Sequence, residues 1–187
     1  SELALDTAWF SGINNRFAVT QYTHKEIEDG QVGTLFENDS WQLRTDLLLN
    51  ELAEWHGALS IDFKGSDFVA IGDEAFTPPS STTSAALGLL EEKHFGDLLV
   101  QLGARVERVE IEADLIDQTL RQSFTPVSVS TGLVYDFAKG FNVGLSYTYS
   151  SRAPSASELF AFGPHIGTGS YEIGATYDFL LDAHDDH

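Results

Sequence analysis

The residues best suited to chemistry are histidines and carboxylates near the carboxyl end of the sequence. His165 follows Gly163-Pro164 in a stretch expected to be a long loop, and Glu158 lies shortly before it. A neutral imidazole and a carboxylate are both ligands that Zn²⁺ accepts in proteins. A single histidine in a loop is more often a surface or turn residue, so both interpretations of His165 stay open. One histidine and one glutamate cannot make a tight site, so zinc binding there is expected to be weak or transient.

A second group of possible ligands ends the sequence. His184, Asp185 and His187 combine two imidazoles with a carboxylate, a set that binds Zn²⁺ weakly. The alternative is a solvated acidic terminus, which needs no ligand to explain it.

Enzymatic chemistry finds little support in the sequence. The chain contains 0 cysteines, so it has neither a thiol nucleophile nor a thiolate metal site. No spacing of serine, histidine and carboxylate marks a catalytic set, and no glycine-rich phosphate loop is present. We therefore expect a protein that is not an enzyme.

The charge balance excludes another class of function. The chain carries 29 acidic and 10 basic side chains, for a net charge of -19. Nucleic-acid binding requires clustered lysine and arginine, so no nucleic-acid partner is expected. A hydrophobic content of 42% with 13 phenylalanines also excludes a disordered acidic tail. The acidic excess would attract cations, although solubility alone is an equally simple reason for it.

Nearly the whole sequence alternates between apolar and polar residues with a period of two, which predicts β-strands. Short and long connections between these strands alternate strictly. Short connections are expected near 11–12, 50–54, 92–96 and 138–140, and long ones at 29–39, 66–82, 110–124 and 151–170. The expected strands cover 3–9, 14–27, 41–49, 56–64, 83–91, 98–107, 127–137, 141–149 and 171–179.

This pattern predicts an all-β fold, an antiparallel up-and-down barrel of the transmembrane type or a segment of one. About 8–10 strands are expected, with short turns at one end and long loops at the other. Residues 1–187 are expected to form a single barrel domain or barrel fragment without a plug domain. Alternation alone does not separate a membrane barrel from a soluble sheet with an aromatic-rich core. In a membrane barrel the leucines face lipid, exemplified by Leu43, Leu59, Leu102 and Leu145. The charges that share strands with them then face the lumen: Arg44, Asp62, Lys64, Arg105 and Glu107.

Two motifs carry a family resemblance. The stretch Arg152-Ala153-Pro154 … Glu158-Leu159-Phe160 resembles the R-x-P-x-x-x-E-L-[FY] segment of TonB-dependent outer-membrane receptors. The following Gly163-Pro164-His165 and 168–174, with parts of 28–39 and 68–79, resemble the ZnuD-type zinc-receptor branch. The resemblance covers about residues 22–174.

This resemblance implies the barrel portion of a receptor for zinc uptake in the bacterial outer membrane. Its partners would be outer-membrane lipid, the metal ion, and the plug domain and TonB of the parent receptor. It also strengthens the interpretation of His165 as a zinc ligand. In the family a turn with Asn-Pro or Asp-Pro commonly follows Glu172-Ile173-Gly174, whereas residues 175–181 here predict more strand. The alternative is a non-transporting module for binding or display, a soluble or engineered β-barrel made from receptor strands.

Overall fold

The computed structural model describes residues 2–5, 7–28, 30–72, 75–115, 117–165 and 169–177. One antiparallel sheet of nine strands dominates the fold, and a small hairpin and a short helix lie beside it. Within the described residues, no helix combines the length and apolar character needed to cross a membrane.

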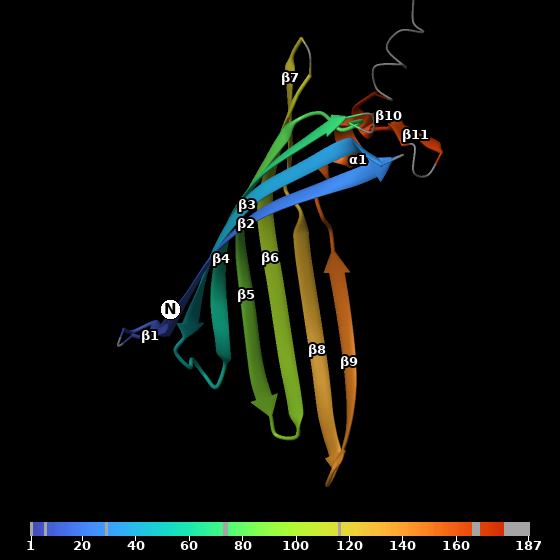
Figure 1. The fold of residues 1–187 in the computed structure, drawn as a ribbon. Helices are drawn as coiled ribbons and strands as arrows, with labels where there is room; N and C mark the ends of the chain where they lie inside the picture. Colours follow the sequence, from blue (N-terminus) through green and yellow to red (C-terminus); the bar gives the residue numbers. More distant parts are fainter. Residues whose placement is uncertain are drawn as a thin grey trace, which may run out of the picture.

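The main sheet follows the chain order almost without exception. Its strand order is β1-β2-β3-β4-β5-β6-β8-β9, and β7 pairs with the far part of β6 (Figure 1). The path begins at β1 and ends at β9, so the sheet is open and represents a segment of a barrel wall. The strands of this sheet are β1 (Glu2–Ala4), β2 (Phe10–Glu28), β3 (Gln31–Leu49), β4 (His56–Gly72), β5 (Ser80–Phe95), β6 (Leu98–Asp114), β7 (Thr119–Phe124), β8 (Val127–Ala138) and β9 (Phe141–Ser150).

The predicted up-and-down topology is confirmed, as is the sorting of connections to opposite ends. One end of the sheet carries the β2–β3, β4–β5 and β6–β7 connections and the segment after β9; we call it the loop end. The opposite end, the turn end, carries the tight connections at 50–55, 96–97 and 139–140 (Figure 1). Gly96 and Gly140 have φ of 63° and 82°, a backbone conformation that glycine adopts without steric cost.

Three of the four predicted long loops are largely strand, and this part of the prediction is wrong. β3 already begins at Gln31, β4 continues to Gly72, and β6 continues to Asp114 before β7 returns along it. β2 and β3 each contain 19 residues, which at about 3.3 Å per residue span roughly 60 Å. That length exceeds the roughly 25 Å apolar band of a membrane barrel, so the strands project well past it.

The predicted final strand over 171–179 is also wrong. β11 (Ser170–Ile173) ends at Ile173, and residues 175–177 form a helical turn. β11 pairs with β10 (Phe162–His165) in a separate two-stranded sheet, not with the main sheet. Residues 178–179, and the further strand expected up to 181, lie outside the described residues.

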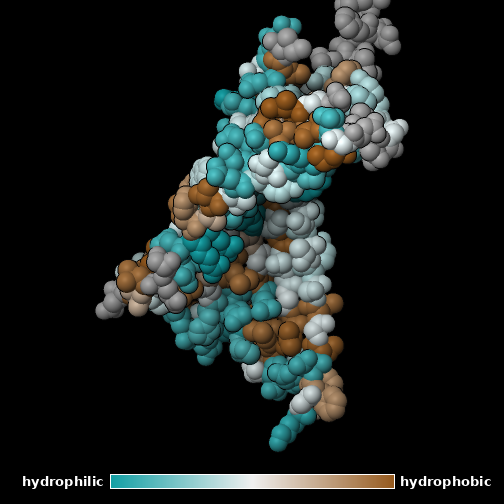
Figure 2. Space-filling model, in the orientation of Figure 1, coloured by the Kyte–Doolittle hydropathy of each residue, from teal (hydrophilic) through white to brown (hydrophobic). Residues whose placement is uncertain are grey.

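The two faces of the main sheet match the prediction for a barrel wall. Two cavities of about 450 and 510 Å³ lie on the face that carries Lys64, Arg105 and Glu107, which we call the inner face. The larger is lined by residues of β2, β3, β4, β5, β6, β8 and β9, so this face is concave across the sheet. Leu43, Leu102 and Leu145 lie on the opposite, outer face and are 37%, 44% and 71% exposed. In Figure 2 the middle of β8 and β9 is pale, the colour of residues that are neither strongly hydrophilic nor strongly hydrophobic.

Several charged side chains of the inner face have polar or charged partners on that face, which offsets the cost of their partial burial. Asp62 is only 3% exposed and accepts two hydrogen bonds from Nε2 of Gln42, at 3.0 and 3.1 Å. Arg44 pairs with Asp46 at 2.9 Å, and Arg105 pairs with Glu107 at 3.5 Å.

The polarity of both faces reverses partway along β6. On β6 the outer face is apolar from Leu98 to Val106 and then carries Arg108, Glu110 and Glu112. The inner face does the opposite, because Arg105 and Glu107 give way to Val109, Ile111 and Ala113, which are at most 7% exposed. The apolar stretch Leu98–Val106 rises roughly 26 Å, close to the height of a lipid-facing band.

The outer face also changes from apolar to charged residues at paired positions of β3 and β4. On β3 the outer face changes from Leu43 and Trp41 to the exposed Asp39 and Glu37. On β4 it changes from Phe63 to Asp67, and the register pairs Asp67 with Asp39. Trp41 lies where the change occurs, the position that indole rings favour at a membrane surface. A change from apolar to charged residues on the outer face can therefore be followed on β3, β4 and β6, and beyond it Val69 and Ile71 of β4 are apolar again.

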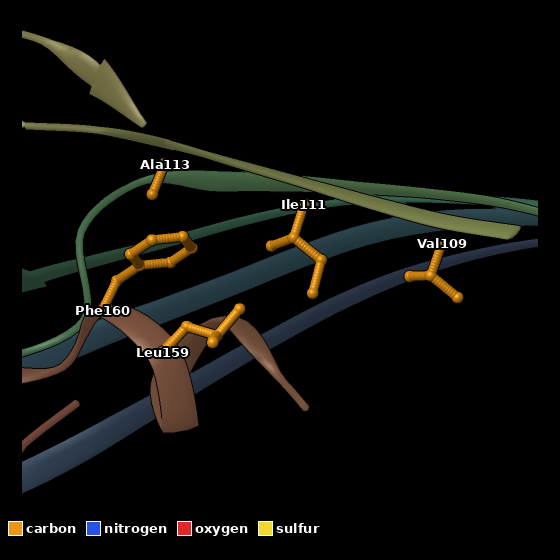
Figure 3. Close-up of a cluster of buried hydrophobic side chains, with 5 residues drawn as sticks. All are labelled: Val109, Ile111, Ala113, Leu159 and Phe160. Carbon is orange, nitrogen blue, oxygen red and sulfur yellow. The ribbon is translucent and has the colours of Figure 1, made fainter. Parts of the chain in front are cut away.

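The reversed inner face at the loop end holds the main apolar core. Val109, Ile111 and Ala113 of β6 pack against Leu159 and Phe160 of α1 (Ala156–Phe160) (Figure 3). Leu120 and Phe124 of β7 add to this cluster. The core therefore lies between the sheet and the segment that follows β9.

Candidate functional site: the segment after β9

The segment 151–165 begins at the edge of the sheet and turns onto its inner face. Ser151 exchanges hydrogen bonds with Val127 of β8: its Oγ donates to the carbonyl oxygen and accepts from the N–H, both at 2.9 Å. Residues 151–154 then line the 450 Å³ inner cavity together with residues of β2 to β6. The chain thus crosses the concave face close to the loop end before α1 begins.

Arg152 and Glu158 form a clamp that closes this segment on itself. Arg152 donates from Nη1 and Nη2 to the two carboxylate oxygens of Glu158, at 2.7 and 2.6 Å. The bidentate geometry fixes the separation of two residues that lie on either side of the helix start.

The same carboxylate also starts the helix. Ser155 is the N-cap: its Oγ accepts from the Glu158 N–H at 3.2 Å, and its own N–H donates to Glu158 at 2.7 Å. This capping box satisfies donors that a helix end would leave without partners. The Arg152 guanidinium and the Ser155 N–H lower the pKa of Glu158 from its usual 4.5 to about 2. Glu158 therefore stays ionised at any physiological pH.

These contacts direct Glu158 toward Arg152 and Ser155, and none of them involves His165. As a zinc ligand Glu158 would have to give up part of the clamp, so that assignment stays a prediction. The sequence motif places arginine and glutamate six residues apart, and in the structure this spacing allows the clamp that stabilises the local fold.

His165 lies in the β10–β11 hairpin, where it contacts the carboxylate of Glu172. The Nδ1 atom of His165 is 3.5 Å from Oε1 of Glu172, because the register places the two residues diagonally on one face of the hairpin. Two ligand atoms about 2.0–2.1 Å from a tetrahedral Zn²⁺ lie roughly 3.4 Å apart, so the pair is spaced for one ion. Sequence reasoning missed Glu172 as a candidate, because the hairpin that brings it to His165 was expected to be a loop and a strand.

The hairpin is held against the loop end of the sheet through Phe76. The ring of Phe76 lies 5.1 Å from that of His165, and the Phe162 N–H donates to the Phe76 carbonyl at 2.7 Å. A Cβ atom at Gly163 would lie 2.9 Å from Cβ of Phe76, so the close approach depends on glycine. Gly174 donates to the Ala161 carbonyl at 2.7 Å and ties the hairpin back to α1.

Within the part of the chain that the structure describes, no three His, Cys, Asp or Glu residues are arranged to hold one metal ion. The other predicted ligands, His184, Asp185 and His187, lie outside the described residues. His165 and Glu172 therefore form a two-ligand contact at the loop end, suited to weak and reversible capture.

Comparison with known proteins agrees with this architecture. A family model described as "TonB dependent receptor-like, beta-barrel" matches residues 2–179. The match spans the whole main sheet, the clamp and the β10–β11 hairpin. The chain therefore belongs to the β-barrel family of TonB-dependent receptors.

Proposed function

We propose that this chain forms the lipid-spanning wall of an outer-membrane receptor whose cargo is a divalent metal ion, with zinc the favoured ion. The family itself implies an outer-membrane receptor barrel, and it implies a plug domain and TonB as partners in the parent receptor. The proposal adds the position of the bilayer on the sheet and the identity of the cargo.

The reversal of face polarity is the observation that carries the membrane placement. A soluble sheet would bury its apolar outer face, yet Leu102, Leu133 and Leu145 are 44%, 37% and 71% exposed there. An exposed apolar face of this kind is suited to contact with lipid. The charged residues Glu37, Asp39 and Glu110 then lie in water beyond it.

The cargo proposal rests on chemistry at the loop end. His165 and Glu172 offer a nitrogen and an oxygen at a spacing that suits Zn²⁺. A net charge of -19 raises the local concentration of any cation. Two ligands bind weakly, and weak binding suits an ion that must be passed on after capture.

Calorimetry with zinc chloride on the detergent-solubilised chain tests the cargo proposal. Truncating the chain after Asp182 removes His184, Asp185 and His187. Any heat of zinc binding that remains then comes from the receptor fold. In that background His165→Ala and Glu172→Gln should each weaken binding by about tenfold or more, since each removes one of two ligands. His24→Ala is the matched control, because His24 also faces a glutamate, at 4.0 Å, but on β2.

Two outcomes would contradict the zinc assignment. Binding that disappears on truncation alone would place the zinc in the tail and make the hairpin structural. Binding unchanged in both hairpin variants would leave the chain as scaffold only.

A separate measurement tests the membrane placement: the folded barrel portion should need detergent and migrate differently on a gel before and after heating. A chain that stays soluble without detergent would support the alternative of a soluble binding or display module.

A further inference from the structure

A groove of about 370 Å³ opens on the outer face of the sheet at the turn end, far from the clamp and the hairpin. Trp9, Trp55 and Leu52 form its walls, and Leu49 and Leu102 contribute apolar surface from β3 and β6. One ionisable side chain, Glu91 of β5, lines the same groove. The groove lies at the lower edge of the apolar part of the outer face.

The groove exists because the connection between β3 and β4 folds back across the outer face. Leu52 and Trp55 exchange backbone hydrogen bonds at 3.0 and 3.3 Å, and Ala53 and Glu54 between them have φ of 52° and 67°. Such φ values are unfavourable for residues with a side chain, so surrounding contacts must hold the turn.

Lys93 supplies those contacts. Its Nζ atom donates to the Ala53 carbonyl at 2.7 Å and pairs with Glu54 at 3.2 Å, and it lies 5.0 Å from the ring centre of Phe95. The ring of Trp55 meets that of Phe95 edge-on at 6.2 Å. The ammonium group of Lys93 thus contacts the turn, and no ion pair within the described residues joins it to Glu91.

Glu91 has room in the groove because its neighbour is a glycine. The register places Glu91 directly opposite Gly57, and a Cβ atom there would lie 2.5 Å from Cδ of Glu91. Among the described residues, the Glu91 carboxylate makes neither a hydrogen bond nor an ion pair. A half-buried carboxylate without such a partner, at the edge of an apolar surface, is free to accept hydrogen bonds from a cationic group outside the chain.

We propose that this groove binds a zwitterionic phospholipid whose headgroup carries a primary ammonium. The ammonium donates to Glu91, the indole N–H groups of Trp9 and Trp55 are donors for the phosphate, and the acyl chains lie on Leu49 and Leu102. A headgroup with this charge order is complementary to a groove that has one carboxylate and two neutral donors. The inference rests on the membrane placement proposed above.

Fluorescence quenching by brominated lipids tests this directly. The chain contains 3 tryptophans, so Trp41→Phe leaves Trp9 and Trp55, both on the groove, as the reporters. The protein is inserted into phosphatidylcholine vesicles that contain equal fractions of brominated phosphatidylethanolamine or brominated phosphatidylglycerol. Quenching by the ethanolamine lipid should be at least threefold stronger at low lipid fraction.

Charge variants separate a specific site from ordinary lipid contact. Glu91→Gln should bring the ratio of the two quenchers close to one, and Glu91→Lys should reverse it in favour of the anionic lipid. Glu110→Gln, on the outer face beyond the polarity reversal, should leave the ratio unchanged. Quenching without headgroup preference, or a preference that survives Glu91→Gln, would overturn the lipid site while leaving the membrane placement intact. Absence of quenching by either lipid would overturn both.

Discussion

Removing the ring of Phe160 should release α1 from the inner face of the sheet. Phe160 is 0% exposed and packs in the cluster with Leu159, Ile111 and Ala113. Truncating a fully buried phenylalanine to alanine costs about 3–5 kcal/mol. α1 has only 5 residues and is too short to persist without packing, so the cost falls on its docking. The ratio of docked to undocked segment should then fall by about 10²–10⁴-fold.

Hydrogen exchange followed by mass spectrometry measures this change in Phe160→Ala. The reporters are the Leu159 N–H, which donates to Ser155 at 3.2 Å, and the Ala161 N–H, which donates to Ser157 at 3.1 Å. Phe162→Ala is the control, because Phe162 lies in the same segment but is 54% exposed. Its effect should stay near about 1 kcal/mol, the usual strength of an aromatic contact. Equal protection of these amides in Phe160→Ala and the unmodified chain would refute the role of the cluster.

Three further predictions follow from paired charges and close contacts. The lowered pKa of Glu158 means that the clamp stabilises the segment above pH 4.5 and that this stabilisation is lost as the pH falls toward 2. Nuclear magnetic resonance of the Glu158 carboxyl should show a midpoint near 2, and Arg152→Ala should move it back toward 4.5; an unmoved midpoint contradicts the clamp. Asp62→Ala should cost about 1–3 kcal/mol in urea unfolding, because it leaves the half-buried Gln42 amide without its acceptor, whereas Asp67→Ala, at an exposed residue, should cost far less. Gly65→Ala should displace the Trp41 ring, since a Cβ atom there would lie 2.4 Å from its Nε1; unchanged Trp41 emission in a Trp9→Phe, Trp55→Phe background would disprove that contact.

The sequence alone predicted the lipid-facing part of the fold well. Between Trp41 and Leu47, or Val100 and Val106, one face is apolar and the other polar or glycine, so strand and face follow from period two. Past Val106 the strand continues with the polarity of the two faces exchanged, and past Trp41 the outer face changes to Asp39 and Glu37 while Ser40 and Asn38 keep the inner face polar. A single apolar face cannot be followed beyond these positions, and for this reason residues 31–39 and 110–114 were expected to be loop.

The candidate site was less accessible to sequence reasoning. The pairing of Arg152 with Glu158 is local and could be predicted from the motif. The contact between His165 and Glu172 depends on a hairpin that forms because Gly163 and Gly174 allow close approach to Phe76 and α1. The groove around Glu91 joins residues from four separate stretches of the chain, and it depends on the turn that Lys93 holds through the Ala53 carbonyl. Neither arrangement leaves a periodic signal.

Cysteine labelling along β6 tests the central claim most directly. The chain has 0 cysteines, so single substitutions on its outer face report without background. In the outer membrane of intact cells, cysteines at positions 100, 102, 104 and 106 should resist a membrane-impermeant maleimide, whereas those at 108, 110 and 112 should react. The change from shielded to reactive should fall between Val106 and Arg108. Uniform labelling from 100 to 112 would show that water reaches the whole outer face, and would contradict the account of this sheet as a membrane wall.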